Sequence, residues 1–446
     1  MKRNFSVVLA LSALILTGGC KKAITSNSVD LAGGAKASFA LNTQWQQPTL
    51  NGRVIRYDIN DGHGSDCLFT YDIGTGMVSL TQVSGSGSTT IVNNEGLLVQ
   101  NSSPFDIRAY NTDVTDNYNE VGGVHFIPYD ATGSGHEDHL LMYIPGRGIV
   151  YLWTYAGNGV WQQTWNSSTG IGGYNLTGFY DKIIAYDWQG SGTKKDLICY
   201  RPGSGIFWVL VNTGTASAPV WTPRVQSNGG VGGFDLKGTM DQLAAFEGPI
   251  SGYMGLIAYR PSYGYVWGMS HSANSVNWVA NDFSSRQGLY QSTVAFPASN
   301  IAPPYFTCDD LQDRILIMNP LSFPAAVTNA GPDDLWFPYR PGGTGGGLAA
   351  SYLYTVQYDN LPPEDGGNGG GDLTARNLFP GQGSNYQLTH DPYNGTSYGT
   401  GIGDHIIAFS PTDQGNTDLL FYSNGGGNAS QLYTWNAGTS SYTQVY

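Results

Sequence analysis

The sequence is built from six copies of one unit, and this repetition is its most constraining feature. The two clearest copies occupy residues 180–211 and 240–269, and each is followed by a segment that carries a tryptophan, Trp221 or Trp278. A repeated unit of this length decides the fold, because each copy covers its apolar face with the neighbouring copies. The chain is therefore predicted to be an array of one structural unit.

Each copy is predicted to form four short β-strands joined by tight turns. The first strand is an alternating apolar segment such as KIIAYD (182–187), and the second is a short apolar run such as DLICY (196–200). A turn that often contains Pro and Gly leads to a third strand, which carries Trp153, Trp208, Trp267 or Trp435 in four of the copies. The fourth strand is marked by Trp161, Trp221, Trp278 or Tyr442. Strands joined by such short turns form antiparallel hairpins.

Four-stranded units of this length are typical of β-propeller blades, which pack radially around a channel. The predicted first strands begin at residues 53, 124, 182, 242, 314 and 405. We predict an all-β fold in which residues 39–446 form a single propeller of six four-stranded antiparallel blades. The alternative is seven blades, with a degenerate blade around residues 96–120. A further strand near residues 43–50 is expected either to close the ring or to belong to that degenerate blade.

Composition agrees with an all-β chain and excludes one class of partner. Of 446 residues, 62 are Gly, and only 12% are charged. The formal net charge is −13. An acidic surface repels phosphate backbones, so nucleic acid is not an expected partner.

The N-terminus is predicted to direct export. Lys2 and Arg3 precede an apolar stretch at residues 7–16, and Cys20 follows two glycines. An apolar stretch of this length is typical of a signal peptide. The end of the segment resembles a bacterial lipobox, which implies that residues 1–20 are a lipoprotein signal peptide and that Cys20 is lipidated. Residues 21–38 then form a flexible tether, and the protein is expected in the cell envelope, lipid-anchored at the outer membrane. Ordinary signal cleavage is the alternative.

The turns between the first and second strands carry oxygen-bearing side chains at regular spacing. The clearest turns run from Asp130 to Asp138 and from Asp58 to Asp66. This layout resembles the FG-GAP or VCBS-type propeller repeat, a family that includes lectin-like propellers and whose turns bind calcium. The resemblance implies these candidate ligands: Asp130, Thr132, Ser134 and Asp138 in one turn, and Asp58, Asn60 and Asp66 in the other. Calcium prefers six to eight oxygen ligands with several carboxylates, and these turns keep few carboxylates. The alternative is that Asp and Ser cap the turn through local hydrogen bonds, in which case the protein has no cofactor.

An arginine recurs at the turn between the second and third strands, and a tryptophan follows it on the third strand. These positions are occupied by Arg201, Arg260 and Arg340, and by Trp208 and Trp267. Aromatic faces cover the apolar side of a pyranose ring, and guanidinium groups bind its hydroxyls, so this pattern indicates carbohydrate binding. The alternative is that the tryptophans pack between blades. Arginine is less readily explained as core, because charged groups are rarely fully buried.

The sequence contains no HExxH motif and no phosphate-binding loop of the GxxxxGK[ST] type. The chain is therefore predicted to be a monomeric binding module, with a glycan or an envelope protein as its partner. The alternatives are a glycan-active hydrolase with a central acidic site and a protein-interaction scaffold. Cys67 and Cys199 lie in apolar strands and are expected to be buried free thiols, with one disulfide as the alternative.

Overall fold

The computed structural model of the protein describes residues 52–58, 66–84, 90–113, 123–157, 160–247, 254–261, 263, 265–272, 274–282, 314–318, 335–339, 354–359, 372–377, 404–409, 418–423, 431–436 and 441–444. All of these residues belong to one compact unit, Lys36–Tyr446. The predicted strand near residues 43–50 and the N-terminal segment lie outside the described residues. Among the residues that are described, no helix combines the length and the hydropathy needed to cross a membrane.

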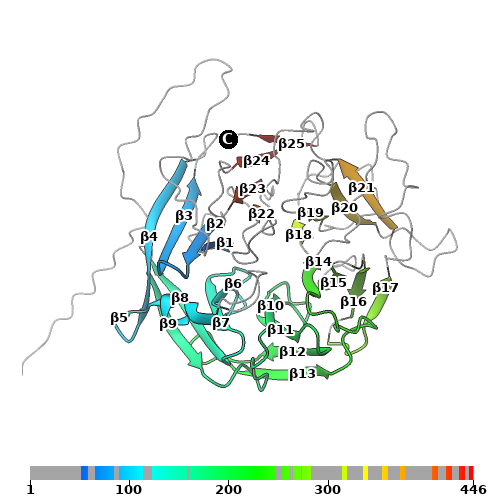
Figure 1. The fold of residues 1–446 in the computed structure, drawn as a ribbon, viewed down its shortest axis with the longest axis horizontal. Helices are drawn as coiled ribbons and strands as arrows, with labels where there is room; N and C mark the ends of the chain where they lie inside the picture. The colour runs from blue at the N-terminus through cyan, green and yellow to red at the C-terminus, as the bar shows by residue number, and fades with distance from the viewer. Residues whose placement is uncertain are drawn as a thin grey trace, which may run out of the picture. The chain divides into compact units, whose positions relative to one another are not determined.

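Four of the sheets match the predicted unit, with four antiparallel strands in chain order (Figure 1). These sheets are the third to sixth blades. The third blade contains β10 (Lys182–Tyr186), β11 (Asp196–Arg201), β12 (Ile206–Asn212) and β13 (Trp221–Ser227). The fourth blade contains β14 (Gln242–Glu247), β15 (Met254–Arg260), β16 (Tyr265–Ser270) and β17 (Val279–Asp282). The fifth blade contains β18 (Arg314–Met318), β19 (Leu335–Tyr339), β20 (Tyr354–Asp359) and β21 (Asp372–Asn377). The sixth blade contains β22 (Asp404–Phe409), β23 (Asp418–Ser423), β24 (Gln431–Asn436) and β25 (Ser441–Gln444).

The first two blades share one sheet, which the repeat pattern does not predict. The first blade contains β1 (Gly52–Asp58), β2 (Asp66–Asp72), β3 (Met77–Ser84) and β4 (Thr90–Gln100), and the second contains β6 (His125–Tyr129), β7 (His139–Ile144), β8 (Ile149–Gly157) and β9 (Val160–Ser167). Strand β4 is 11 residues long. Its first part pairs with β3, and Leu97–Val99 continues into a parallel pairing with β9. Because β4 is longer than β3, its end joins the outer edge of the first blade to the outer edge of the second.

The first strands of the six blades form a closed cycle: each contacts the next along the chain, and β22 contacts β1. The protein is therefore an all-β propeller with six blades among the described residues. Residues of the proposed seventh blade instead form the end of β4, the short strand β5 (Ser103–Pro104) and the 3-10 helix η2 (Ile107–Asp113). Phe105, which lies between β5 and η2, packs on Tyr151 and Trp153 of the second blade, so this segment covers a blade and is not one.

The first strand of each blade, called the inner strand below, carries a tyrosine near its end in the first three blades. The hydroxyl of this tyrosine forms a hydrogen bond with the next blade. The Tyr57 hydroxyl donates to the carbonyl oxygen of Asp138 at 2.7 Å, and the Tyr186 hydroxyl lies 2.8 Å from the Met254 carbonyl oxygen. The Tyr129 hydroxyl donates to the Lys195 carbonyl oxygen at 2.5 Å. Each of these tyrosines is fully buried, so the bond replaces one that water would otherwise make.

The tryptophans of the outer segments complete these tyrosine contacts. Trp161, Trp221 and Trp278 lie with ring centroids 6.1, 6.3 and 6.2 Å from Tyr57, Tyr129 and Tyr186, respectively. The indole N–H of Trp221 also donates to the Tyr129 hydroxyl at 3.0 Å. Tryptophan on the outer segment of one blade therefore accompanies tyrosine on the inner strand of the blade before it.

The glycine-rich segments that precede β10 and β14 form tight turns closed by paired backbone bonds, Ile171 with Tyr174 and Val231 with Phe234. Gly170 begins one turn with φ +89°, and a Cβ there would lie 1.8 Å from the Tyr174 carbonyl oxygen. Only glycine fits such a position. The equivalent Gly230 has the same constraint against Phe234. These turns fix Tyr174 and Phe234 beside the blades.

The cysteine prediction is confirmed for the described residues. Cys67 and Cys199 are both buried free thiols. Burial raises the pKa of Cys199 well above its ordinary value, because the thiolate has no solvent to stabilise it. Cys308 lies outside the described residues.

Candidate functional site

Arg201 lies at the end of β11 in a dense polar network. Its Nε donates to Asp181 Oδ1 at 2.6 Å, and its Nη2 donates to Asp181 Oδ2 at 2.7 Å and to Asn175 Oδ1 at 2.9 Å. Asp181 also accepts the Tyr174 hydroxyl at 2.6 Å and the backbone N–H of Gly178 at 2.7 Å. The hydrogen bond to Asp181 raises the pKa of Arg201, so the guanidinium stays charged.

Arg260 repeats this geometry in the fourth blade. Its Nε and Nη2 bind the two carboxylate oxygens of Asp241 at 2.7 Å each, and Nη2 also contacts Asp235. The Arg260 guanidinium lies over the Phe234 ring at 5.2 Å, which places an aromatic face beside the charge. Hydrogen bonding to Asp241 raises the pKa of Arg260.

These two arginines join the linker before each blade to the blade itself. The carboxylates of Asp181 and Asp241 have no exposed side-chain surface, whereas 21% of the Arg201 side chain and 16% of the Arg260 side chain remain exposed. The guanidinium groups are therefore held by buried carboxylates and present one edge to solvent. Arg340, the third predicted arginine, lies outside the described residues.

Trp208 and Trp267 pack between blades, as the alternative interpretation expects. Trp208 meets Tyr174 edge to face at 5.7 Å, and Trp267 meets Phe234 in the same way at 6.0 Å. Both tryptophans are partly buried and border the hydrophobic clusters of their blades. Tyr174 therefore contacts both Arg201 and Trp208, and Phe234 contacts both Arg260 and Trp267.

Two exposed tyrosines beside Arg260 were not among the predicted site residues. Tyr263 and Tyr265 are 66% and 45% exposed, and their ring centroids lie 6.0 Å apart. The Arg260 guanidinium lies 5.9 Å from the Tyr265 ring centre. The signal in the sequence is a departure from the repeat: the fourth blade has Tyr263 and Tyr265 where the third has Ser204 and Ile206.

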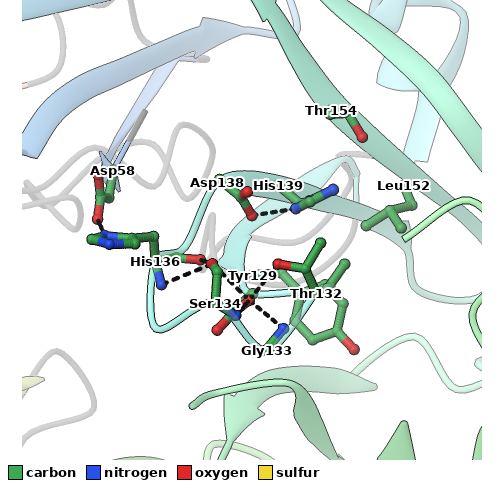
Figure 2. Close-up of polar contacts among 12 residues, drawn as sticks. Asp58, Tyr129, Thr132, Gly133, Ser134, His136, Asp138, His139, Leu152 and Thr154 are labelled. Carbon is green, nitrogen blue, oxygen red and sulfur yellow. Dashed lines mark hydrogen bonds and ion pairs between the residues drawn. The ribbon is translucent and has the colours of Figure 1, made fainter. Parts of the chain in front are cut away.

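The turn that begins at Asp130 has the geometry of a capped turn. Asp130 Oδ1 accepts the backbone N–H groups of Gly133 and Ser134 at 2.7 and 2.9 Å, and its Oδ2 accepts that of Gly135 at 2.8 Å. The Thr132 hydroxyl donates to the same carboxylate at 3.3 Å, one of the contacts drawn around this turn in Figure 2. Asp130 is 1% exposed, and both of its oxygens are used by the turn itself.

Two of the other predicted calcium ligands contact histidine side chains. Asp138 contacts Nδ1 of His139, and Asp58 contacts Nδ1 of His136 at 2.9 Å (Figure 2). Asn60 and the side chain of Asp66 lie outside the described residues. Among the residues that the structure describes, no three His, Cys, Asp or Glu side chains gather in a way that could hold a metal ion. The Asp130 carboxylate is bonded to the N–H groups of its own turn, and calcium binding stays a prediction.

Ion pairs connect the turns of the first three blades at this end of the sheets. Glu137 in the second blade contacts Arg56 of the first, and its Oε1 lies 3.2 Å from Lys194 Nζ of the third. Burial opposes ionisation of Glu137, but the two cations outweigh it and lower its pKa to about 2. The hydrogen bond to Asp58 raises the pKa of His136. These ion pairs therefore connect neighbouring blades.

Comparison with known proteins gives structural likeness only. No protein-family model and no curated protein matches the chain. A lectin from Agrocybe aegerita that recognises non-reducing terminal N-acetylglucosamine is 12% identical, with a TM-score of 0.46, over 91% of this chain and 83% of the lectin. AofleA from Arthrobotrys oligospora is 11% identical, with a TM-score of 0.41, over 88% and 86%. The periplasmic gluconolactonase of Pseudomonas aeruginosa is 11% identical, with a TM-score of 0.31, over 52% and 53%.

Proposed function

We propose that this protein is a carbohydrate-binding module and that its fourth blade carries a binding site. The observation that supports this site is the group of Tyr263, Tyr265 and Arg260 at one hairpin tip, with the tyrosines exposed and the guanidinium fixed by Asp241. Asp235 adjoins Arg260 and is 45% exposed at its side chain. The tip therefore combines aromatic faces, a cation and a carboxylate within a small area.

This combination suits a sugar better than an apolar ligand. Tyrosine presents a large apolar face and a polar hydroxyl, so it contacts the C–H face of a pyranose while bonding its hydroxyls. Hydrogen bonds from a charged donor or to a charged acceptor are about twice as strong as neutral ones. Arg260 and Asp235 supply one of each. Because Asp241 already orients the guanidinium, little side-chain freedom is lost when a ligand binds.

The test is a glycan array screened with the soluble part of the chain, residues 23–446, followed by titration of any glycan retained. We expect Tyr263→Ala with Tyr265→Ala to weaken binding at least tenfold. Each tyrosine would lose an aromatic contact and a hydrogen bond worth about 0.5 to 1.5 kcal/mol each, and about 1.4 kcal/mol corresponds to a tenfold change in affinity. Val276→Ala is the matched control, because Val276 is 59% exposed in the same blade. Retention unchanged in the double variant would move the site away from this tip.

The effect of the Tyr263 and Tyr265 changes separates this function from the alternatives. A hydrolase would bind its ligand at a central acidic site and keep that binding in the double variant, and a scaffold would bind no glycan. Asp181 and Asp241, two of the recurring acids at the starts of the inner strands, are both held in ion pairs with arginine. These ion pairs support a structural role for the two acids.

We also propose that the chain is exported and anchored at the outer membrane through lipidated Cys20. Basic residues at the start, an apolar stretch and Gly-Gly-Cys support this proposal. Stable anchoring requires more than one acyl chain, which a bacterial lipoprotein carries on its first cysteine. We expect Cys20→Ser to move the protein from the membrane fraction to the soluble fraction. A variant that fractionates like the parent would rule out this anchor.

A further inference from the structure

One polar residue at the start of each inner strand occupies the same place in all six blades. Each of these residues pairs in register with the tyrosine near the end of the second strand. The pairs are Arg53 with Tyr71, His125 with Tyr143, Lys182 with Tyr200, Gln242 with Tyr259, Arg314 with Tyr339 and His405 with Tyr422. We name the six inner-strand members the basic ring.

The fold places the basic ring at one level around the inner edge of the propeller. The six inner strands contact one another in a closed cycle, and register fixes each ring member at the same end of its strand. The tyrosines link successive members: the Tyr200 hydroxyl accepts the backbone N–H of Leu243 at 3.1 Å, next to Gln242 in the following blade. The Tyr71 and Tyr143 hydroxyls bond the backbone of Phe126 and Ile183 in the same way.

The side chains of two members lie along these tyrosines. The His125 ring stacks on Tyr143 at 5.1 Å with 17° between the planes, and the His405 ring stacks on Tyr422 at 5.1 Å with 21°. The Nε2 of Gln242 is buried and has no hydrogen-bond partner among the described residues. A buried amide donor without a partner lacks a hydrogen bond that an incoming oxygen would supply.

The charge of the basic ring is opposite in sign to the net charge of the chain. Three members are Arg or Lys, two are His, one is Gln, and none is acidic, although the chain has a net charge of −13. The aspartates that precede Lys182 and Gln242 are Asp181 and Asp241, whose carboxylates are bound to Arg201 and Arg260. The negative charge of these two aspartates is therefore compensated locally by arginine.

We propose that the basic ring is a binding site for an oxyanion, a phosphate or carboxylate group, at one end of the propeller. Cations gathered around a low-dielectric rim attract an anion more strongly than isolated surface lysines do. Arginine binds either group through two parallel hydrogen bonds. The proposal does not rest on carbohydrate binding by the fourth blade, since the two sites share no residue.

The test is isothermal titration of the folded chain, residues 23–446, with inorganic phosphate and separately with D-glucuronate, at constant ionic strength. Both probes carry an oxyanion group, and the probe that binds with the lower dissociation constant shows whether phosphate or carboxylate is preferred. We expect Arg53→Gln and Lys182→Gln each to weaken binding about tenfold, the loss of one charge-assisted hydrogen bond. Arg224→Gln is the control: it makes the same charge change at an exposed residue of β13 and should bind like the parent.

Two results would overturn the proposal. One is the absence of binding heat with both probes in the parent protein, and the other is an equal loss of affinity in Arg224→Gln and Lys182→Gln. A melting curve for each variant confirms that it is folded. If Arg53→Gln does not fold, Lys182→Gln alone decides. The double variant of Tyr263 and Tyr265 should bind both probes normally, so failure of the glycan site and failure of the basic ring are distinguishable.

Discussion

Replacing Asp181 with Ala should lower the free energy of unfolding by about 3 to 5 kcal/mol, the range found when one member of a buried ion pair is removed. The Asp181 carboxylate has no exposed surface and accepts four hydrogen bonds, from Arg201 Nε and Nη2, the Tyr174 hydroxyl and the Gly178 amide. Alanine would leave all four donors without this acceptor. The linker between the second and third blades would lose its attachment to β10.

Urea unfolding of the parent, Asp181→Ala, Arg201→Ala and the double variant measures this effect and separates the pair from its surroundings. We expect the double variant to be destabilised by less than the sum of the single variants, because the second change removes a charge already left unpaired. Asp235→Ala is the control, since its ion pair with Arg260 is at the surface and contributes about 1 kcal/mol or less. A loss below about 1 kcal/mol in Asp181→Ala would show that the carboxylate does not hold the linker.

The repeat predicts the architecture because each blade uses the same residues for the same contacts. The six predicted first strands begin within one residue of the strands in the structure, and the second strand predicted at residues 196–200 corresponds to β11. The pairing of β4 with β9 was not predictable from the sequence. It depends on β4 being longer than β3, and no pattern of apolar residues indicates that difference in length. A sequence repeat predicts the strands and contacts that all blades share, but not the contacts that occur in one blade alone.

The same limit applies to the candidate site. The recurrence of Arg201 and Arg260 was visible in the sequence, but their partners Asp181 and Asp241 lie about twenty residues away and meet them only when the inner and second strands pair. The recurrence of Trp208 and Trp267 in the sequence is the same whether the two side chains bind a ligand or pack on Tyr174 and Phe234, so the sequence does not distinguish these roles. Tyr263, in contrast, is found by comparing the fourth blade with the third, where it replaces a serine.

Tyr129→Phe should lower the free energy of unfolding by about 3 kcal/mol, although it removes only one oxygen. That oxygen accepts the Trp221 indole N–H and the Asn212 amide, each at 3.0 Å, and donates to the Lys195 carbonyl oxygen. Each buried polar group left without a partner costs about 1 to 3 kcal/mol, and here three lose one contact together. Burial raises the pKa of Tyr129 above its ordinary range, so the hydroxyl is the form present under all conditions of the test.

The repeat supplies the control for this prediction. The fourth and sixth blades have Phe246 and Phe409 at the position of Tyr129, so a phenyl ring fits there without strain. In the Tyr129→Phe background, Trp221→Phe removes one of the hydrogen-bond donors that have lost their acceptor. Its additional loss of unfolding free energy should therefore be smaller than that of Trp221→Phe in the parent. Chemical denaturation of the four proteins measures the coupling. Equal costs in both backgrounds would show that the tyrosine and the tryptophan stabilise the blade interface by ring packing alone, with no contribution from the hydrogen bond between them.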